Sequence, residues 1–180
     1  MSMMARSPKY LIVEALAALV VATIVVVGAN AVRAADIEPL VPPTGDVLLT
    51  VGGAIDRTTD GEWALFDMAM LEHLPKTVVR TTTPWTEGEQ VFEGVLFRDL
   101  AAFLGASGSQ VQALALNDYL IEIPTSDFEQ DEVIIAYLQN GQEMSVRDKG
   151  PLWVIYPDSI ENPHAQARMV WQLVKVIFVQ

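Results

Sequence analysis

Short apolar runs rich in β-branched residues, separated by turn-forming residues, cover most of the chain after residue 46. Such runs, bounded by Gly, Pro, Asn and Asp, are typical of β-strands. Asn140-Gly141 follows one of them and is the strongest hairpin signal in the sequence, because both residues tolerate the positive φ of a type I′ turn. The predicted strands cover residues 46–51, 76–83, 111–116, 119–123, 133–138, 152–156 and 173–179.

Two short helices complete the pattern. Asp67 can cap a helix over residues 68–74, and the apolar spacing over residues 98–104 predicts a second helix that ends at Gly105. Many strands with few, short helices favour an α+β fold over a doubly wound sheet. We therefore expect a mainly β mixed core with short peripheral helices.

The first 34 residues have the pattern of a secretory signal peptide. Arg6 and Lys9 form a basic start, a mostly apolar stretch covers residues 10–28, and Val32-Arg33-Ala34 fits a small-x-small cleavage site. Export to the periplasm or to the medium is therefore expected. An uncleaved membrane anchor is the alternative, which the short apolar core and its interruption by Glu14 disfavour.

The remainder of the chain is predicted to hold one domain. Residues 35–46 carry Pro39, Pro42 and Pro43 with little periodicity, which predicts an extended N-terminal tether. Residues 47–180 are numerous enough to bury a sizeable core of their own.

The composition is strongly acidic, and this limits the partners. The chain has 23 acidic and 11 basic residues, a formal net charge of −12. Removal of residues 1–34 takes away one acidic and three basic residues, which leaves 22 against 8, or −14. A field of this sign repels nucleic acid and anionic lipid. We therefore expect no nucleic-acid partner and, after signal cleavage, no membrane partner.

The chain also contains no cysteine. Neither a disulfide nor a thiolate metal site can therefore form, although an exported protein would be in a compartment that permits disulfides.

Three blocks in the domain resemble the molybdopterin-binding domain of the sulfite oxidase family. They read V-F-E-G-V-L-F-R-D-L-A-A-F-L-G from residue 91, L-N-D-Y-L-I-E-I-P from residue 116, and A-Y-L-Q-N-G-Q-E-M-S-V-R-D-K-G-P-L-W-V-I-Y-P from residue 136. In the family, a "w-x-G-v-x-l-r-d-l-L" block precedes an "s-x-D-G-Y" block. A block ending in "G-x-P-l-r-l-v-v-P" follows. The resemblance covers residues 47–179 and implies a sulfite oxidase-like molybdopterin-binding fold.

Alignment of Trp85 and of the block around Gly94 with the family also places its metal-ligating cysteine near Thr81, Thr82 or Thr83. A threonine hydroxyl has too high a pKa to replace a soft thiolate on molybdenum. The structural alternative for these residues is packing within a strand, and a hydroxyl-lined remnant of the pocket is the functional one.

Other family positions have changed as well. Asn117-Asp118-Tyr119 stands in place of the D-G-Y block, and Asp118 can also serve simply as a turn residue. Arg147 and Lys149 form a cationic pair that suits an anionic ligand, with a solvated loop as the alternative. Trp153 replaces an arginine that the resemblance associates with the pterin.

The candidate binding site predicted from the sequence combines these positions, and we assign no catalytic and no metal-binding residue. Of the cations that the family places near its C-terminus for the cofactor phosphate, residues 163–171 keep Arg168 alone. The candidate site consists of Thr82, Thr83, Trp85, Asn117, Asp118, Tyr119, Arg147, Lys149 and Trp153.

Two functions follow from the resemblance and its losses. The first is an exported, degenerate and non-catalytic molybdopterin-binding-like domain that binds a small anionic or flat ligand, or a periplasmic partner protein, as a binding or sensory module. No cofactor is expected in that case. The alternative is a molybdopterin-dependent oxidoreductase that holds its cofactor without a cysteine ligand.

Cleavage of the signal peptide has a direct test. We expect N-terminal sequencing of the exported protein to begin at Ala35, because Val32-Arg33-Ala34 fits the signal peptidase pattern. Recovery of the chain from the membrane fraction with Met1 intact would contradict cleavage and favour the anchor.

Overall fold

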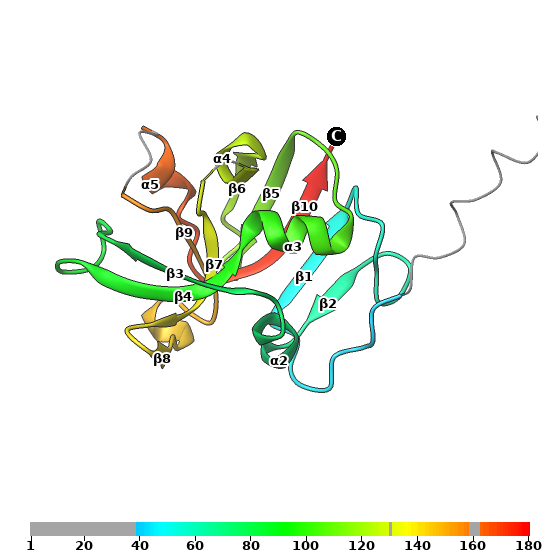
Figure 1. Cartoon of the computed structure of the whole chain (residues 1–180), viewed down its shortest axis with the longest axis horizontal. Helices are drawn as coiled ribbons and strands as arrows, with labels where there is room; N and C mark the ends of the chain where they lie inside the picture. Colours follow the sequence, from blue (N-terminus) through cyan, green and yellow to red (C-terminus); the bar gives the residue numbers. More distant parts are fainter. Residues whose placement is uncertain (1–38, 130, 159–162) are drawn as a thin grey trace, which may run out of the picture. The chain divides into compact units, whose positions relative to one another are not determined.

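Two β-sheets form the domain in this computed structural model, which describes residues 39–129, 131–158 and 163–180 (Figure 1). The predicted signal peptide lies outside the described residues. The first sheet has the order β2-β1-β10-β5-β6. Its strands are β1 (Leu49–Gly53), β2 (Ala64–Phe66), β5 (Gln110–Ala115), β6 (Leu120–Pro124) and β10 (Leu173–Val179).

The second sheet has the order β3-β4-β7-β8, and β9 pairs with β7 as well. Between the named strands of the described residues, β1 and β10 pair in parallel and all other pairs are antiparallel. The strands are β3 (Lys76–Thr81), β4 (Gln90–Leu96), β7 (Ile134–Gln139), β8 (Gln142–Glu143) and β9 (Trp153–Ile155).

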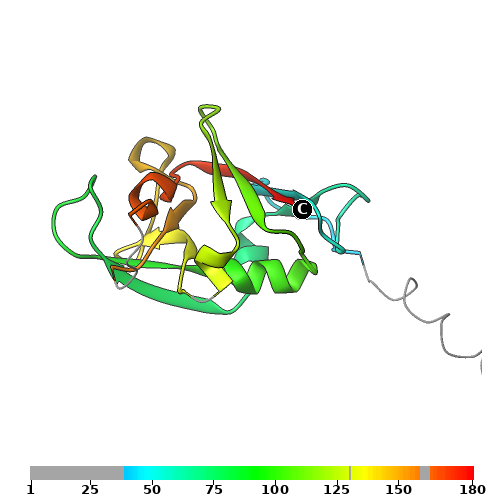
Figure 2. The ribbon, with the colours of Figure 1, turned by 90° about the horizontal axis from the view of Figure 1, so that it is seen from above.

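The described helices are short and lie around the sheets (Figures 1 and 2). Asp67 caps α2 (Met68–Glu72) by accepting a hydrogen bond from the Met70 N–H at 2.9 Å. Gly105, with φ of +63°, ends α3 (Phe97–Leu104) in the left-handed conformation that glycine allows at low cost. The others are α4 (Ser126–Glu129), the 3-10 helix η1 (Val146–Asp148) and α5 (Ala165–Arg168).

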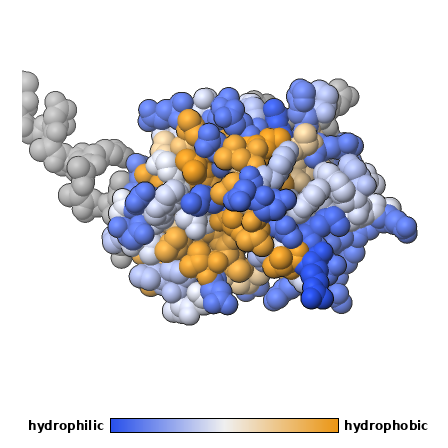
Figure 3. Space-filling model, turned by 180° about the vertical axis from the view of Figure 1, so that it is seen from behind, coloured by the Kyte–Doolittle hydropathy of each residue, from blue (hydrophilic) through white to orange (hydrophobic). Residues whose placement is uncertain are grey.

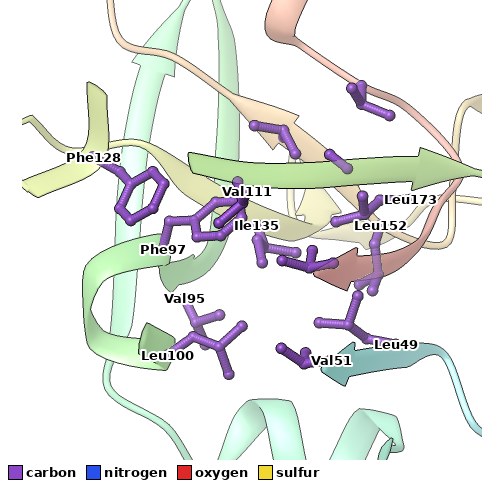
Figure 4. Packing of buried hydrophobic residues seen from close by; sticks show 14 of the residues in the cluster. Leu49, Val51, Val95, Phe97, Leu100, Val111, Phe128, Ile135, Leu152 and Leu173 are labelled. Atoms are coloured by element: carbon purple, nitrogen blue, oxygen red, sulfur yellow. The ribbon is translucent and has the colours of Figure 1, made fainter. Parts of the chain in front are cut away.

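The main core lies between the first sheet, α3 and one face of the second sheet, and Figure 4 shows part of it. A second, smaller core covers the other face of the second sheet. Strand β7 contributes side chains to both cores, because successive side chains of a strand point to opposite faces of the sheet. Ile135 and Tyr137 belong to the main core, whereas Ile134 and Ala136 belong to the second.

The expected α+β class, mostly sheet with a few short helices, is confirmed. Strand β10 has the predicted bounds, and the Asn140-Gly141 turn joins β7 to β8 with φ of +52° and +76°. Strand β3 ends at Thr81, two residues before its predicted end. Strand β4 was not predicted, because Glu93 and Gly94 interrupt its apolar run; the three-residue β2 is too short to give a pattern.

Part of the predicted N-terminal tether can be described. Residues 39–46 contain no helix or strand, and they contact the domain. Leu40 is buried, and its N–H donates to the Thr58 carbonyl at 2.9 Å. The Gly45 and Thr44 N–H groups donate to Asp67 Oδ2 at 2.8 and 2.9 Å. Hydrogen bonds from Gly45 and Met70 lower the pKa of the Asp67 carboxyl, so its ionised form holds this segment and α2 together.

The face of the first sheet that points away from the main core carries both apolar and charged residues. Leu114 and Lys175 are paired on this face, next to Leu120, which is exposed. Figure 3 shows this side of the molecule, where hydrophobic residues gather around a hydrophilic stretch. No helix among the described residues has the length and apolar character to span a membrane.

Gly94 allows β4 and β7 to approach each other closely. A Cβ atom at this position would lie 2.1 Å from the Ile135 carbonyl oxygen and 2.6 Å from the Ala136 Cα. Both atoms belong to the backbone of β7, which cannot give way without loss of strand pairing.

We therefore expect Gly94→Ala to lower the free energy of unfolding by about 3 kcal/mol or more, by overpacking. Gly45→Ala is the matched control, since its Cβ would meet nothing closer than Asp67 Oδ2 at 3.4 Å. Urea unfolding of both variants checks the expectation, and equal stabilities would show that β4 and β7 can separate.

Candidate functional site

Four aromatic side chains build the centre of the candidate site. Trp153 of β9 is fully buried in the second core, and its ring lies 5.3 Å from that of Phe92 on β4. The Trp153 indole N–H donates to the Met169 carbonyl at 3.2 Å. Trp171 and Trp85 cover this pair, with ring centroids 4.6 Å apart and planes at 76°. The buried indole of Trp153 therefore supports the indoles of Trp85 and Trp171.

The backbone explains how Trp171 reaches this position. Residues 170–173 run beside β9, with an antiparallel bridge between Trp153 and Trp171 and a 2.8 Å hydrogen bond from the Val154 N–H to the Val170 carbonyl. The same segment continues into β10 of the first sheet. It therefore connects the two sheets and carries Trp171 at the crossing.

A pocket of about 230 Å³ opens beside the indoles. Trp85 comes from the β3–β4 loop, Tyr119 from the β5–β6 turn, and Trp171 from the segment before β10. Trp85 and Tyr119 are 38% and 49% exposed, which makes them accessible to a ligand. The lining residues are Trp85, Ala115, Asn117, Tyr119, Gln166, Ala167, Met169, Val170 and Trp171.

The β5–β6 turn is held by local hydrogen bonds. The Tyr119 N–H donates to Asn117 Oδ1 at 3.2 Å, and the Ala115 N–H donates to the Tyr119 carbonyl at 2.9 Å. Asp118 has φ of +64°, in the left-handed region that aspartate tolerates better than most residues. Asp118 stands where the resembled block has glycine. Because aspartate tolerates this positive φ, the turn forms without a glycine.

Gln172 ties this turn to η1. Its carbonyl accepts from the Leu116 N–H at 2.9 Å, and its N–H donates to the Lys149 carbonyl at 3.0 Å. Its side-chain amide donates to the Val146 carbonyl at 2.6 Å. Gln172 therefore connects the β5–β6 turn, which lines the pocket, to η1, which does not.

A second cavity, of about 420 Å³, adjoins the first, since Gln166 and Met169 line both. Its polar groups come from the end of β3 and from the residues after β9. The lining residues are Thr82, Thr83, Pro84, Tyr156, Pro157, Asp158, Ala165, Gln166 and Met169.

Asp158 joins the walls of this second cavity. Its carboxylate accepts from the Thr81 hydroxyl at 2.8 Å and from the Thr82 N–H at 3.0 Å. Partial burial acts to raise the pKa of Asp158, but the hydrogen bonds from Thr81 and Thr82 outweigh it and lower the pKa below its ordinary value. The carboxylate is therefore charged at neutral pH.

A partly buried polar triad anchors α5, which supplies one wall of both cavities. Arg168 of α5 forms an ion pair of 2.6 Å with Asp127 of α4. The Tyr156 hydroxyl donates to the same Asp127 carboxylate oxygen at 2.8 Å. Burial, and then the hydrogen bond to Asp127, raise the pKa of the Tyr156 phenol well above its ordinary value, so it stays neutral.

The nine residues predicted from the sequence are distributed over several places. Trp85, Asn117 and Tyr119 line the first pocket, and Thr82 and Thr83 line the second cavity.

The other four predicted residues line neither cavity. Trp153 supports the outer indoles from below, Asp118 faces solvent in the turn, and Arg147 is exposed on η1. Lys149 places its ammonium nitrogen 5.6 Å from the Trp153 ring centroid.

Sequence analysis missed Asp158 and the wall formed by Gln166 and Met169. Asp158 follows the third resembled block directly, but a single aspartate after a strand carries no recognisable signal. Gln166 lies in a four-residue helix that is too short to show periodicity, and Met169 directly follows that helix.

The residues at the family's cofactor positions do not fit molybdopterin. Thr81 is fully buried, and its hydroxyl is engaged by Asp158 and by the Tyr156 carbonyl, 3.0 Å away. Arg168, expected at the phosphate, is held by Asp127. Within residues 39–129, 131–158 and 163–180, no group of three or more His, Asp or Glu side chains could hold a metal ion.

Comparison with solved structures relates the fold to that of an enzyme. No protein-family model matches the sequence, and no curated protein matches it. A similar solved structure is the crystal structure of the sulfane dehydrogenase SoxCD from Paracoccus pantotrophus, with a TM-score of 0.55 and 17% sequence identity. The match covers 72% of this chain and only 37% of that chain. At this identity it shows a distant likeness of fold and no more.

The triad that anchors α5 predicts a response to alkaline pH. Because the folded-state pKa of Tyr156 is raised, the unfolded chain loses the phenol proton first, near its ordinary pKa of about 10. The folded state then holds more protons than the unfolded state, and stability falls as pH rises above about 10.

We expect Tyr156→Phe to lower stability at pH 7 by about 1.5–3 kcal/mol, through loss of a hydrogen bond to a charged group. The variant should then lose less stability than the wild type between about pH 9.5 and 11. Urea unfolding across this range measures both effects, with Tyr119→Phe, at an exposed tyrosine, as the control. Parallel pH curves for wild type and Tyr156→Phe would contradict the role of this phenol.

Proposed function

We propose that this protein is an exported, non-catalytic module that binds a small organic ligand in the aromatic pocket. The observation that carries the proposal is the placement of Trp85, Tyr119 and Trp171, from three separate segments, around one accessible pocket. Large exposed aromatic side chains are costly to leave in water and are common in ligand sites with a few polar groups. Asn117 and Gln166 supply such groups here.

The sequence suggested a flat or an anionic ligand, and the pocket wall gives no support to the anionic one. The residues that line the pocket include aromatic faces but no lysine, arginine or histidine. The expected cationic pair lies elsewhere, with Arg147 exposed on η1 and Lys149 against Trp153. An anion would therefore find no counter-charge in the pocket wall.

The non-catalytic part of the proposal is supported by the chemistry of the residues. The similar solved structure is that of a sulfane dehydrogenase, but a shared fold does not transfer an activity. The chain offers no thiolate, and the hydroxyl of Thr81 is already used within the protein. A binding or sensory role in the periplasm, toward a small ligand or a partner protein that presents one, needs neither a thiolate nor a free hydroxyl.

Metal content separates this proposal from the oxidoreductase alternative. Protein purified after export from a molybdenum-replete host should contain far less than one molybdenum per chain, because no thiolate ligand is available. Elemental analysis with a protein concentration from amino-acid analysis measures the ratio. About one molybdenum per chain would overturn the proposal and place the oxidoreductase first.

Ligand binding itself is tested with a mixed library of neutral, anionic and cationic fragments, followed by NMR of the indole N–H signals. We expect bound fragments to shift Trp85 and Trp171 and to leave Trp63 unchanged, since Trp63 does not line the pocket. Arg147→Ala should leave this binding unchanged. A library without any fragment that shifts Trp85 or Trp171 would contradict the binding function.

A further inference from the structure

The walls of the first pocket face in different directions. The Trp85 and Trp171 planes meet at 76°, and Trp171 stands at 89° to the buried Trp153. Tyr119 adds a third aromatic ring to the wall. A flat ring can lie against only one of these faces at a time, whereas a compact, rounded group can contact several. The geometry therefore favours a rounded apolar group.

The charge around the pocket favours a cation. The whole chain has a net charge of −12, and the lining residues of the pocket carry no positive charge. In the adjoining cavity Asp158 is ionised, and none of the ion pairs among the described residues involves it. Thr82 and Thr83 line the same cavity, again without a lysine or arginine.

The indole cluster already holds one ammonium group. Lys149 places its Nζ atom 5.6 Å from the Trp153 ring centroid, within the range of a cation–π contact. Lys149 does not line the pocket, and the accessible indoles of Trp85 and Trp171 remain for a ligand. The negative potential over an indole face attracts a cation without forming a salt bridge.

The polar groups of the pocket suit a cation without N–H donors. A primary ammonium needs three hydrogen-bond acceptors. Among the lining side chains, Asn117 Oδ1 already accepts from the Tyr119 N–H, which leaves Gln166 and the Tyr119 hydroxyl as acceptors for three donors. A quaternary ammonium needs no acceptor and presents a rounded surface of methyl groups, which about 230 Å³ accommodates.

We propose that the pocket of Trp85, Tyr119 and Trp171 binds a small organic cation through a quaternary, methylated ammonium group. This rests on the proposed binding function and assigns its ligand class. The rings enclose the methyl groups, and Asp158 in the adjoining cavity supplies long-range attraction.

Choline and its uncharged analogue 3,3-dimethylbutan-1-ol test the charge directly, because they share a shape and differ in the charged nitrogen. We expect calorimetry of the exported protein to show choline binding at least about 10-fold more tightly than the analogue, as a desolvated cation–π contact implies. Equal affinities, or no binding of choline at 50 mM, would overturn the proposal. If other fragments still bound at Trp85, the binding function would survive and only the ligand class would fall.

Variants test the place of binding. Trp85→Leu keeps an apolar side chain and removes the indole face, so we expect choline affinity to fall about 10-fold or more with little change for the analogue. Trp63→Leu removes an indole outside the pocket and should leave choline binding unchanged. Asp158→Asn should weaken choline about 2- to 3-fold at low salt and less at high salt, as expected for a screened attraction. Melting curves confirm that each variant is folded. Choline affinity unaffected by Trp85→Leu would overturn the site.

The ammonium group could belong to a free molecule or to a lipid headgroup. Sedimentation with phosphatidylcholine vesicles, released by free choline, would identify the headgroup as the source. Choline binding without sedimentation would identify a free cation. Either result supports the ammonium class, and sedimentation that free choline leaves unchanged would contradict it.

Discussion

Burial of the second sheet on both of its faces is the constraint on which the site depends. Strand β7 contributes to two cores, and β9 does the same, with Val154 in the main core and Trp153 in the second. A sheet covered on one side only would leave Trp153 exposed. Because the second core closes over it, Trp153 gives Trp85 and Trp171 a fixed support. The position of the pocket therefore depends on the second core, which buries Trp153.

The fold could be predicted in outline because its signals are local. The Asn140-Gly141 turn, the Asp67 cap and the Gly105 stop each act within a few residues, and each occurs in the structure. Strand β4 was not predicted because Gly94 interrupts its apolar run. The reason for this glycine is the close approach of β7, which is distant in sequence.

The candidate site could be predicted only in part, for the same reason. Asn117 and Tyr119 were found through a resembled block, and Trp85 through its place after the threonines that align with the family's cysteine; the structure brings the three together. Arg147 was included because it lies in the third block and forms a cationic pair with Lys149, but its position on η1 leaves it exposed and outside both cavities. The contribution of Asp158 depends on hydrogen bonds to Thr81 and Thr82, which lie more than seventy residues away in the chain. A local sequence pattern therefore cannot include Asp158 together with the threonines that it binds.

The origin of Trp85 has a consequence for how this protein can diverge. Its loop joins the ends of β3 and β4, and beyond Thr82 the loop is held by local contacts, such as that of 2.8 Å between the Thr83 and Thr86 hydroxyls. Trp171, in contrast, lies in the segment that connects the two sheets. Mutations in the Trp85 loop can therefore change one wall of the pocket without disturbing the core. The wall that carries Trp171 is fixed by the connection between the two sheets. Related proteins could share the tryptophan at the crossing and differ in selectivity through the loop alone.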